Sequence, residues 1–571
     1  MKQLNYKKEK AVFTAFSFFL MFFLLANCSH IYNWTASQKI AHVVECRILK
    51  FLQVAKITAF NKNILPSSSI KLLISTFLGN ETRNYYGNIA PEDSLFVLWK
   101  FDLGSGKTMI HNEEAIWFGA GWTGQPLLYE EDETVFIIQG AYDHNLRKIN
   151  AENGQEVWRY PFDDVIKGTG TLWVNNKSQN AEEQLIILQG SRQGFENNLA
   201  TFLIPSYRAI SAKSGLEKWR FNSKRTDSYS RDVDGSALVI NDTAYIGLEN
   251  GFFMTFNPNC KNAFLKDGIL QPQIFGEDSL FSPADMVQHG GNLVTESSPA
   301  KLKNHIYIAS GSGHIFGFNM ITKKIDWDFF IGSDIDGSVV VTNDNCLLVA
   351  VEKQYISGNG GVYKLNPAKP ENDCVEWFFP VPDFKFELWE GGVIGSVGIN
   401  DFYLNRYNYL SNNCFPQEDV FAVFPDALEM NGKVDVFNIS NIGNYNSTNF
   451  NAEPLAAFFG INNTLYVVKH TKTIEGMLVT GTDGITQYPC PEIVFTYKTG
   501  PSISTPIFVG NKLFAATYKG LYFFEFDENY NFSLLQHIKQ LGAIEATPIV
   551  HDRKLYIATR HGFLYCLGMK E

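Results

Sequence analysis

Short stretches of alternating apolar and polar residues recur along the chain in pairs, with a polar turn between the two members of each pair. The turn ends in glycine, the residue that tolerates a positive φ in a tight connection. Alternation with a period of two is typical of strands that bury one face. We therefore expect antiparallel hairpins over residues 244–257, 306–319, 512–526 and 554–568, with Gly251, Gly313, Gly520 and Gly562 at their turns.

A further strand flanks these hairpins on either side. Small residues lead into the strand before the hairpin, as in 234–240 and 504–509. After the hairpin come a turn and a strand that carries tryptophan or another large apolar residue. The repeated unit is therefore four short antiparallel strands. Its fourth strands are expected near Trp158, Trp219, Phe275, Trp327, Trp377, Phe495 and Leu535.

A four-stranded sheet of this size cannot bury both of its faces alone, whereas radial stacking covers them, as in a β-propeller. The long interval between Trp377 and Phe495 fits one blade with residues 401–453 as an inserted loop. The chain ends after a third strand at 563–567, and 97–101 reads as a fourth strand without a blade. We predict that these two strands pair. The expected fold is all-β, a single eight-bladed propeller of four-stranded antiparallel blades closed by an N-terminal strand, with seven blades as the alternative.

The N-terminus has the pattern of an export signal. Lysines precede an uncharged Phe- and Leu-rich run over 11–26, which is short for a membrane-spanning helix and suits a signal peptide. The run leads to Cys28, in a setting that resembles a bacterial lipoprotein signal with lipid on that cysteine; plain secretion and an uncleaved anchor are the alternatives. We expect a signal peptide over 1–28, a tether over 29–89 and the propeller over 90–571, in an exported, membrane-anchored protein of the cell envelope.

Composition narrows the possible partners and chemistries. Acidic residues outnumber basic ones, 59 to 48, and the formal net charge of −11 disfavours nucleic-acid binding. The eight cysteines include no CxxC pair and no two adjacent residues, so their spacing supports neither a zinc site nor a thioredoxin-type centre. The motifs of serine hydrolases, zinc proteases and phosphate-binding loops are also missing from the sequence.

The residues that lead into the innermost strands of a propeller ring one end of its axial channel. Several of them carry carboxylates here, and two stretches, 232–236 and 334–338, share the pattern Asp-x-Asp-Gly-Ser. Such a ring concentrates negative potential and suits Ca²⁺, a sugar or a basic segment of a partner. The alternative is structural, because an aspartate before Gly-Ser also caps its own turn. The candidate ligand-binding residues are Asp234 and Asp336, which are also the candidate metal ligands, followed by Gln125, Lys167, Glu296, Glu390 and Glu545.

The Gly-x-x-x-Trp strands, as in 150–160 and 211–221, and the eightfold count resemble the pyrroloquinoline-quinone (PQQ) repeat propellers. That superfamily includes quinoprotein alcohol dehydrogenases and non-catalytic lipoprotein propellers, and we expect a member of the second kind. For a dehydrogenase the resemblance implies a flat PQQ over the axis, a disulfide between adjacent cysteines, a tryptophan floor and a Ca²⁺ ion. Adjacent cysteines are missing, and no ligand set for PQQ or calcium can be assigned by motif.

These observations favour an exported, lipid-anchored propeller that binds a small ligand or a protein partner through its axial face or its inserted loop. No catalytic residue is assigned. One alternative is a PQQ- and calcium-dependent dehydrogenase. Another is a carbohydrate-binding or carbohydrate-processing propeller, which the many aromatic residues and the neighbouring carboxylates favour.

Overall fold

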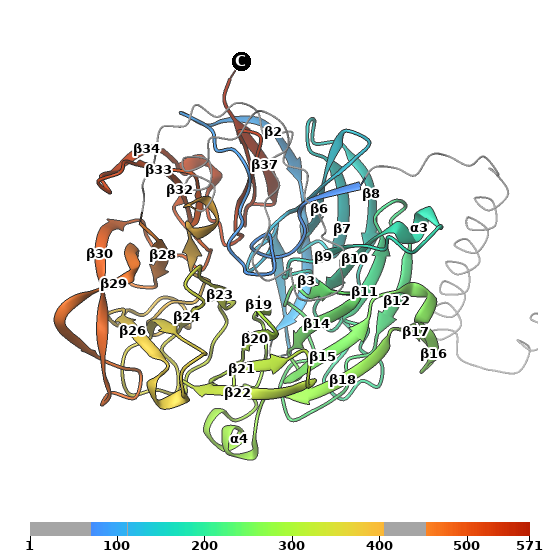
Figure 1. The fold of residues 1–571 in the computed structure, drawn as a ribbon. Helices are drawn as coiled ribbons and strands as arrows, with labels where there is room; N and C mark the ends of the chain where they lie inside the picture. The colour runs from blue at the N-terminus through green and yellow to red at the C-terminus, as the bar shows by residue number, and fades with distance from the viewer. Residues whose placement is uncertain (1–69, 111, 405–452, 571) are drawn as a thin grey trace, which may run out of the picture. The chain divides into compact units, whose positions relative to one another are not determined.

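Eight antiparallel blades form a ring in the computed structural model (Figure 1), which describes residues 70–110, 112–404 and 453–570. Each blade has the four strands of the repeat, and one of them carries a fifth strand. The prediction of an all-β, eight-bladed propeller is confirmed, and the alternative of seven blades is wrong. The chain divides into one unit from Met1 to Ser67 and another from Ser68 to Glu571, to which the ring belongs. Among the described residues, no helix is long and apolar enough to cross a membrane.

In seven blades the strands follow the chain from the innermost to the outermost position. The strands of blades 1 to 4 are, in that order, β5 (Leu127–Glu131), β6 (Thr134–Gly140), β7 (Asn145–Asn150) and β8 (Glu156–Pro161); β9 (Thr171–Val174), β10 (Leu185–Gly190), β11 (Tyr207–Ser211) and β12 (Glu217–Phe221); β13 (Leu238–Ile240), β14 (Thr243–Leu248), β15 (Phe252–Asn257) and β18 (Gln273–Ser279); β19 (Ala300–Leu302), β20 (His305–Ala309), β21 (His314–Asn319) and β22 (Lys324–Phe330).

Blades 5 to 8 continue the same arrangement, and in blade 8 the outermost strand comes from the N-terminal side of the chain. Their strands are β23 (Val340–Val341), β24 (Leu347–Val351), β25 (Gly361–Leu365) and β26 (Val375–Pro380); β27 (Gly398–Ile399), β28 (Leu455–Gly460), β29 (Thr464–Thr480) and β30 (Gln487–Lys498); β31 (Ile507–Val509), β32 (Lys512–Thr517), β33 (Gly520–Phe526) and β34 (Phe532–Ile538); β35 (Ile549–His551), β36 (Lys554–Ala558), β37 (Phe563–Gly568) and β2 (Phe96–Asp102).

The ring closes as predicted, because β2 pairs antiparallel with β37 and supplies the fourth strand of blade 8. Trp99 lies opposite Cys566 in this ladder, and Phe101 lies opposite Leu564. The pairing covers two strand edges that would otherwise stay exposed. Because β2 and β37 lie near opposite ends of the described chain, the ring can close only after almost the whole propeller has been made.

The tryptophans of the fourth strands join neighbouring blades. The indole Nε1 of Trp158 in blade 1 donates to the carbonyl of Ala212 in blade 2, at 3.0 Å, and that of Trp99 in blade 8 donates to Ala151 in blade 1, at 3.2 Å. Gly154 has a φ of +73°, and a Cβ on it would lie 2.8 Å from the Trp99 ring. The glycine of the Gly-x-x-x-Trp motif therefore serves the turn and also makes room for the indole of the preceding blade.

Several elements depart from the repeat and were not predicted. They are β1 (Ile70–Ile74), which adds a fifth strand beside β5; the hairpin of β3 (Ser105–Ile110) and β4 (Glu113–Phe118); the hairpin of β16 (Phe264–Lys266) and β17 (Ile269–Gln271); and the helices α3 (Ala181–Gln184) and α4 (Pro283–His289). Hairpin β29–β30 also extends beyond blade 6, and its tip bonds to Gly358 of blade 5 through the carbonyl of Thr482. Most of the predicted inserted loop, like Cys28, lies outside the described residues.

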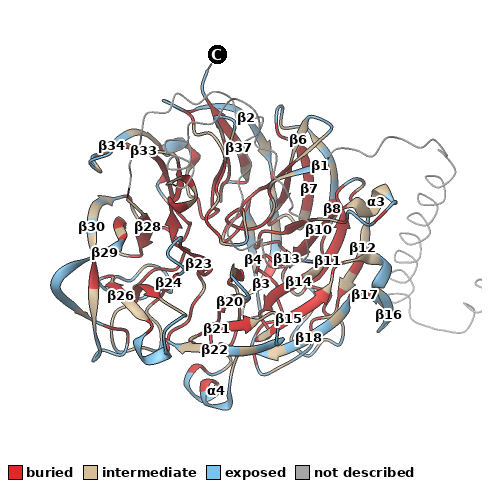
Figure 2. Cartoon of the chain, in the orientation of Figure 1, coloured by how far each residue is buried: buried red, intermediate tan, exposed pale blue. Residues whose placement is uncertain are grey.

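Burial follows the radial order of the strands (Figure 2). The inner strands of the blades are almost wholly buried, whereas most positions of the outer strands are half-buried or exposed, with buried side chains such as Trp219 in β12 and Trp377 in β26. The chain runs into each innermost strand from one face of the ring, which we call the mouth face. Since the strands alternate in direction, the turns between second and third strands also lie on the mouth face.

The axial channel is filled by a segment that we expected to be a tether. Residues 75–90, which we call the plug, follow β1 and hydrogen-bond with the inner parts of blades 1 to 6 and blade 8. The bonds run from Leu78 N to Gln125 Oε1, from Leu172 N to Ser75 O, from Phe77 N to Ser236 Oγ, from Lys301 N to Glu81 O, from Val341 N to Thr82 O, from Ile399 N to Tyr86 Oη and from Val550 N to Tyr86 O. Residues 70–89 are thus an integral part of the propeller.

Arg83 is the central polar residue of the plug, and its side chain is fully buried. Its Nε donates to the carbonyl of Pro299 at 2.8 Å, one Nη donates to Thr76 Oγ1 and to the carbonyl of Phe77, and the other donates to the carbonyl of Ser236 at 2.9 Å. Burial without a carboxylate partner among these groups lowers the pKa of Arg83 to about 9. The guanidinium therefore fastens the plug to blades 3 and 4 by hydrogen bonds to neutral oxygens.

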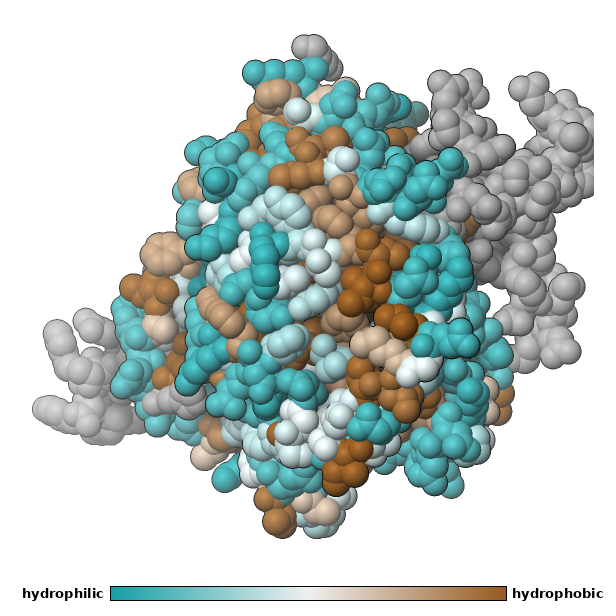
Figure 3. Space-filling view, turned by 90° about the vertical axis from the view of Figure 1, so that its left-hand side faces the viewer, coloured by the Kyte–Doolittle hydropathy of each residue, from teal (hydrophilic) through white to brown (hydrophobic). Residues whose placement is uncertain are grey.

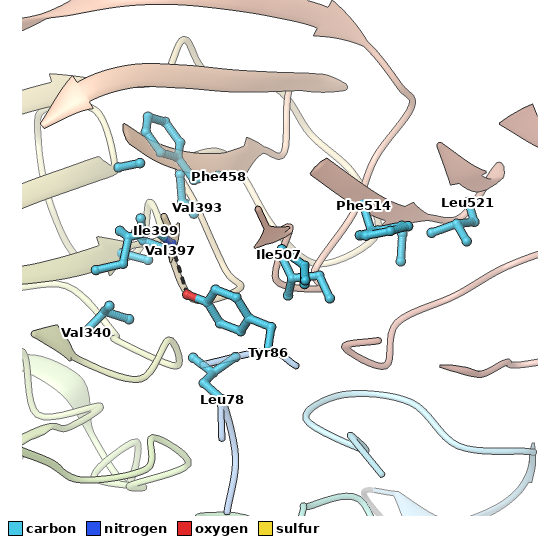
Figure 4. Close-up of a cluster of buried hydrophobic side chains, with 14 of the residues drawn as sticks. Leu78, Tyr86, Val340, Val393, Val397, Ile399, Phe458, Ile507, Phe514 and Leu521 are labelled. Carbon is cyan, nitrogen blue, oxygen red and sulfur yellow. Dashed lines mark hydrogen bonds between the residues drawn. The ribbon is translucent and has the colours of Figure 1, made fainter. Parts of the chain in front are cut away.

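Tyr86 anchors the other half of the plug in an apolar cluster (Figure 4). Its hydroxyl accepts a hydrogen bond from the backbone N–H of Ile399 at 2.9 Å, and its ring lies among buried side chains that include Leu78, Val397 and Ile507. These side chains come from the plug and from blades 6 and 7. The plug thus packs against blades 6 and 7 through Tyr86, in addition to its bonds with blades 3 and 4 through Arg83.

We predict that Arg83→Ala lowers the free energy of unfolding by about 3 kcal/mol, because it leaves several buried carbonyl groups without a donor and opens a cavity. Urea unfolding followed by circular dichroism measures the change. The matched control is Arg225→Ala, because Arg225 is exposed and its loss is expected to change the free energy by less than about 0.5 kcal/mol. Equal stability of the two variants would contradict a structural role for the plug.

Candidate functional site

The mouth face brings together the first Asp-x-Asp-Gly-Ser stretch and Lys167. The Lys167 Nζ forms an ion pair with Asp234 and lies 3.5 Å from Glu296 Oε1 and 3.8 Å from Glu249 Oε1. Asp232, two residues before Asp234, is paired with Arg192 at 2.7 Å. Three of the predicted residues, Lys167, Asp234 and Glu296, therefore lie in one group.

The charges of this group shift the pKa values of its members. Burial lowers the pKa of Lys167, but the carboxylates of Asp234, Glu296 and Glu249 outweigh it and raise the pKa well above its ordinary value. Burial raises the pKa of Asp234 to about 6, although the Lys167 ammonium opposes the rise. It also raises the pKa of Glu249 well above the ordinary value. The lysine stays charged and serves as the built-in counter-ion of the three carboxylates.

Glu249 was missed by the sequence analysis. It follows β14, in the turn between the second and third strands of blade 3. Such turns lie on the mouth face together with the residues that lead into the innermost strands. Its position in a turn on the same face was the signal that could have identified it.

The second Asp-x-Asp-Gly-Ser stretch forms a separate group with Glu352, which follows β24 in the corresponding turn of blade 5. Asn292 Nδ2 donates to Asp334 Oδ2 at 2.6 Å. Burial is the main cause that raises the pKa of Asp334 to about 7 and that of Glu352 to about 9, and neighbouring carboxylates add to both shifts. Burial and the charges of Asp334, Glu296 and Glu352 likewise raise the pKa of Asp336.

The opposite side of the mouth is aromatic. Trp122, Phe386, Trp389 and Tyr518 pack around a small cluster of buried isoleucines from blades 6 and 7. Hairpin β3–β4, which Figure 1 shows near the middle of the ring, adds Trp117 against Tyr142, with ring centroids 5.1 Å apart. The mouth therefore has an acidic side on blades 2 to 5 and an aromatic side on the remaining blades.

The structure does not bring the other predicted residues into the acidic groups. Gln125 is buried and holds the plug, since its side chain accepts from Leu78 N and donates to the carbonyl of Thr76. Glu545 pairs with Arg560 at 2.8 Å and accepts from the Tyr518 hydroxyl at 2.8 Å. Glu390 is exposed to solvent.

The metal-binding potential lies in the first acidic group alone. Among the described residues, Asp234, Glu249 and Glu296 offer carboxylate oxygens that lie within 4.8 Å of one another, whereas Asp336 is not part of this set. Carboxylate oxygens at that spacing suit Ca²⁺. However, the Lys167 ammonium already lies within ion-pairing distance of all three, so a metal ion would have to displace it.

The described residues do not fit the arrangement that the resemblance to quinoproteins implies. Five cysteines lie in the described part of the chain, and all of them are free thiols: Cys260, Cys346, Cys374, Cys490 and Cys566. They offer no disulfide to cover one face of a flat cofactor. With Lys167 among the carboxylates as well, we derive no reaction through PQQ.

Comparison with known proteins supports the fold. No family model and no curated protein matches the chain. Among solved structures, BamB from Moraxella catarrhalis aligns with a TM-score of 0.46 and 10% identity, over 83% of this chain and 100% of that chain. A europium-containing methanol dehydrogenase aligns with a TM-score of 0.50 and 13% identity, over 87% of this chain and 98% of that chain. The alignment with the methanol dehydrogenase supports the propeller fold, and at 13% identity the likeness concerns the fold alone.

We predict that the free energy of unfolding falls as pH rises from about 5 to 9. Asp334, Asp336 and Glu352 have raised pKa values in the folded state, so the unfolded chain loses their protons at lower pH and gains relative stability as pH rises. Asp336→Asn should therefore raise the free energy of unfolding at pH 8 by about 1 kcal/mol and have little effect at pH 4. Urea unfolding at the two pH values measures this, and a destabilised variant at pH 8 would contradict the account.

Proposed function

We propose that this protein is an exported, non-catalytic binding propeller that engages a protein partner in the cell envelope through the mouth face of blades 2 to 6. Lipid attachment at Cys28 belongs to the same proposal, and it rests on the sequence of the signal segment. The plug supports the choice of the mouth face, because it occupies the axial channel and leaves the exposed loops of that face as the surface that a partner can reach.

The observation that carries the proposal is the exposure of large apolar side chains on loops of the mouth face. Leu388 is 91% exposed, Val287 is 89% exposed and Phe202 is 75% exposed. Tyr229 and Tyr355 are also exposed. Exposed apolar side chains on the same face as charged groups are typical of a protein-binding surface. Figure 3, which views the ring from the side of blade 6, shows apolar patches within an otherwise hydrophilic surface.

Site-specific photo-crosslinking in the cells that make the protein tests this function. A photoreactive residue is placed at Leu388 or at Val287, on the mouth face. The matched control is Ile321, because it is 68% exposed in the turn between β21 and β22, on the opposite face of the ring. We predict that both mouth-face positions give the same protein adduct in cell envelopes and that position 321 does not.

Adducts from position 321 alone, or no adduct from either mouth-face position, would contradict the proposal. Circular dichroism of each purified variant checks that the propeller is folded. Since all three positions are exposed, substitution there is expected to leave the free energy of unfolding nearly unchanged.

A further inference from the structure

The two copies of Asp-x-Asp-Gly-Ser differ in their counter-ions. In the first copy, Asp232 pairs with Arg192 and Asp234 pairs with Lys167. In the second copy, no lysine, arginine or histidine among the described residues forms an ion pair with Asp334 or Asp336. The same is true of Glu352. The same motif is thus neutralised by the protein in blade 3 and left without a cation in blade 5.

The amide of Gln354, with its nitrogen turned towards the carboxylates, donates to Glu352 Oε1 at 3.0 Å and to Asp334 Oδ2 at 3.2 Å, yet two buried oxygens of the second group still lack a donor. Asp334 is 7% exposed, and its Oδ1 accepts no hydrogen bond from a described residue. Asn292 is 6% exposed, and its amide Oδ1 also lacks a donor among the described residues, although its Nδ2 binds Asp334. Buried oxygens without donors cost free energy, which a ligand that brings N–H groups would recover.

The spacing of these oxygens favours an extended cation over a metal ion. A metal ion needs several oxygens close together, and among the described residues only Asp234, Glu249 and Glu296 meet that condition. Asp334, Asp336 and Glu352 are more widely spread. A guanidinium carries five N–H donors in a planar fork and an ammonium carries three, so either cation can satisfy oxygens that lie in different directions.

Two exposed tyrosines stand beside this group. Tyr355 is 43% exposed, and its hydroxyl accepts from Asn292 Nδ2 at 3.4 Å. Tyr229 is 55% exposed, and burial of its hydroxyl together with the charges of Glu296 and Asp334 raises its pKa. An aromatic ring next to carboxylates adds a cation–π attraction for a guanidinium or ammonium group.

We propose that the group of Asp334, Asp336 and Glu352 receives an arginine or lysine side chain from a basic segment of the protein partner. This inference rests on the proposed function and names the chemistry of the partner at that site. The cation supplies the donors that Asp334 and Asn292 lack and neutralises carboxylates that otherwise repel one another.

Titration of the purified full-length protein with a fluorescent peptide of alternating glycine and arginine tests the proposal. The neutral control is the same peptide with citrulline, which keeps the shape of arginine without its charge. We expect saturable binding of the arginine peptide that weakens with added salt, and no binding of the citrulline peptide. Equal binding of the two peptides would overturn the proposal.

Amide substitutions of the carboxyl groups show where on the protein the arginine peptide binds. Asp336→Asn and Glu352→Gln should each weaken binding of the arginine peptide at least tenfold, because each removes a carboxyl group that can ionise against the bound cation, at nearly constant shape. The matched control is Glu528→Gln, which removes an exposed negative charge in the turn between β33 and β34 and should leave the affinity unchanged. Both mouth variants should unfold at no lower temperature than the wild type, which separates lost binding from misfolding. Unchanged affinity in both of them would overturn the proposal.

Two further ligands test whether the bound cation is a peptide side chain, a free amine or a metal ion. Spermidine that binds as tightly as the peptide, with the same dependence on Asp336, would overturn the peptide assignment in favour of a free amine. CaCl₂ that displaces the peptide and raises the melting temperature only when Asp336 is present would overturn it in favour of a metal. Failure of this inference can be told apart from failure of the proposed function. If the crosslinked adduct at Leu388 persists in Asp336→Asn and the peptide affinity of that variant is unchanged, only this inference is contradicted.

Discussion

The hydrogen bonds of Arg83 to neutral oxygens in the axial channel are the interaction on which the rest of this structure depends. Neighbouring blades are joined by fourth-strand side chains such as Trp158 and Trp377, whose indoles donate to backbone carbonyls of the next blade. The plug crosses the axis and bonds to blades that are far apart around the ring. Because these bonds fix the innermost strands, the residues that lead into them keep defined positions on the mouth face. The acidic groups owe their geometry to this arrangement.

The acidic groups illustrate how a rigid ring can hold charges that repel one another. The carboxylates of Asp334, Asp336 and Glu352 come from two parts of blade 5, and their raised pKa values show that the folded state disfavours their ionisation. In blade 3, Lys167 and Arg192 form ion pairs with the two aspartates of the same motif. A site whose removal is expected to stabilise the fold is typical of a binding function, because selection keeps the strained charges only if a ligand uses them.

Much of the fold could be predicted from the sequence, because the repeat is local. The turn glycines Gly251 and Gly520, the fourth strand at Trp158 and the closing strand at Trp99 all lie where the pattern placed them. The plug could not be predicted, since the burial of Arg83 depends on contacts with blades 3 and 4 that leave no periodic signal in residues 75–90. The site was predicted in part. Lys167, Asp234 and Glu296, three of the seven candidate residues, lie close together, whereas Glu249 and Glu352 reach the mouth from turns that the sequence analysis did not consider.

The central claim is that the acidic group of blade 5 takes a cationic side chain from a partner. A crystal structure of the protein with an arginine-containing peptide tests it most directly, because it shows both the position and the chemical nature of the bound group. The account predicts a guanidinium whose nitrogens lie within hydrogen-bonding distance of Asp336 and Glu352, with Tyr229 or Tyr355 against its plane. A peptide seated on another face of the ring, or a metal ion among these carboxylates, would contradict it.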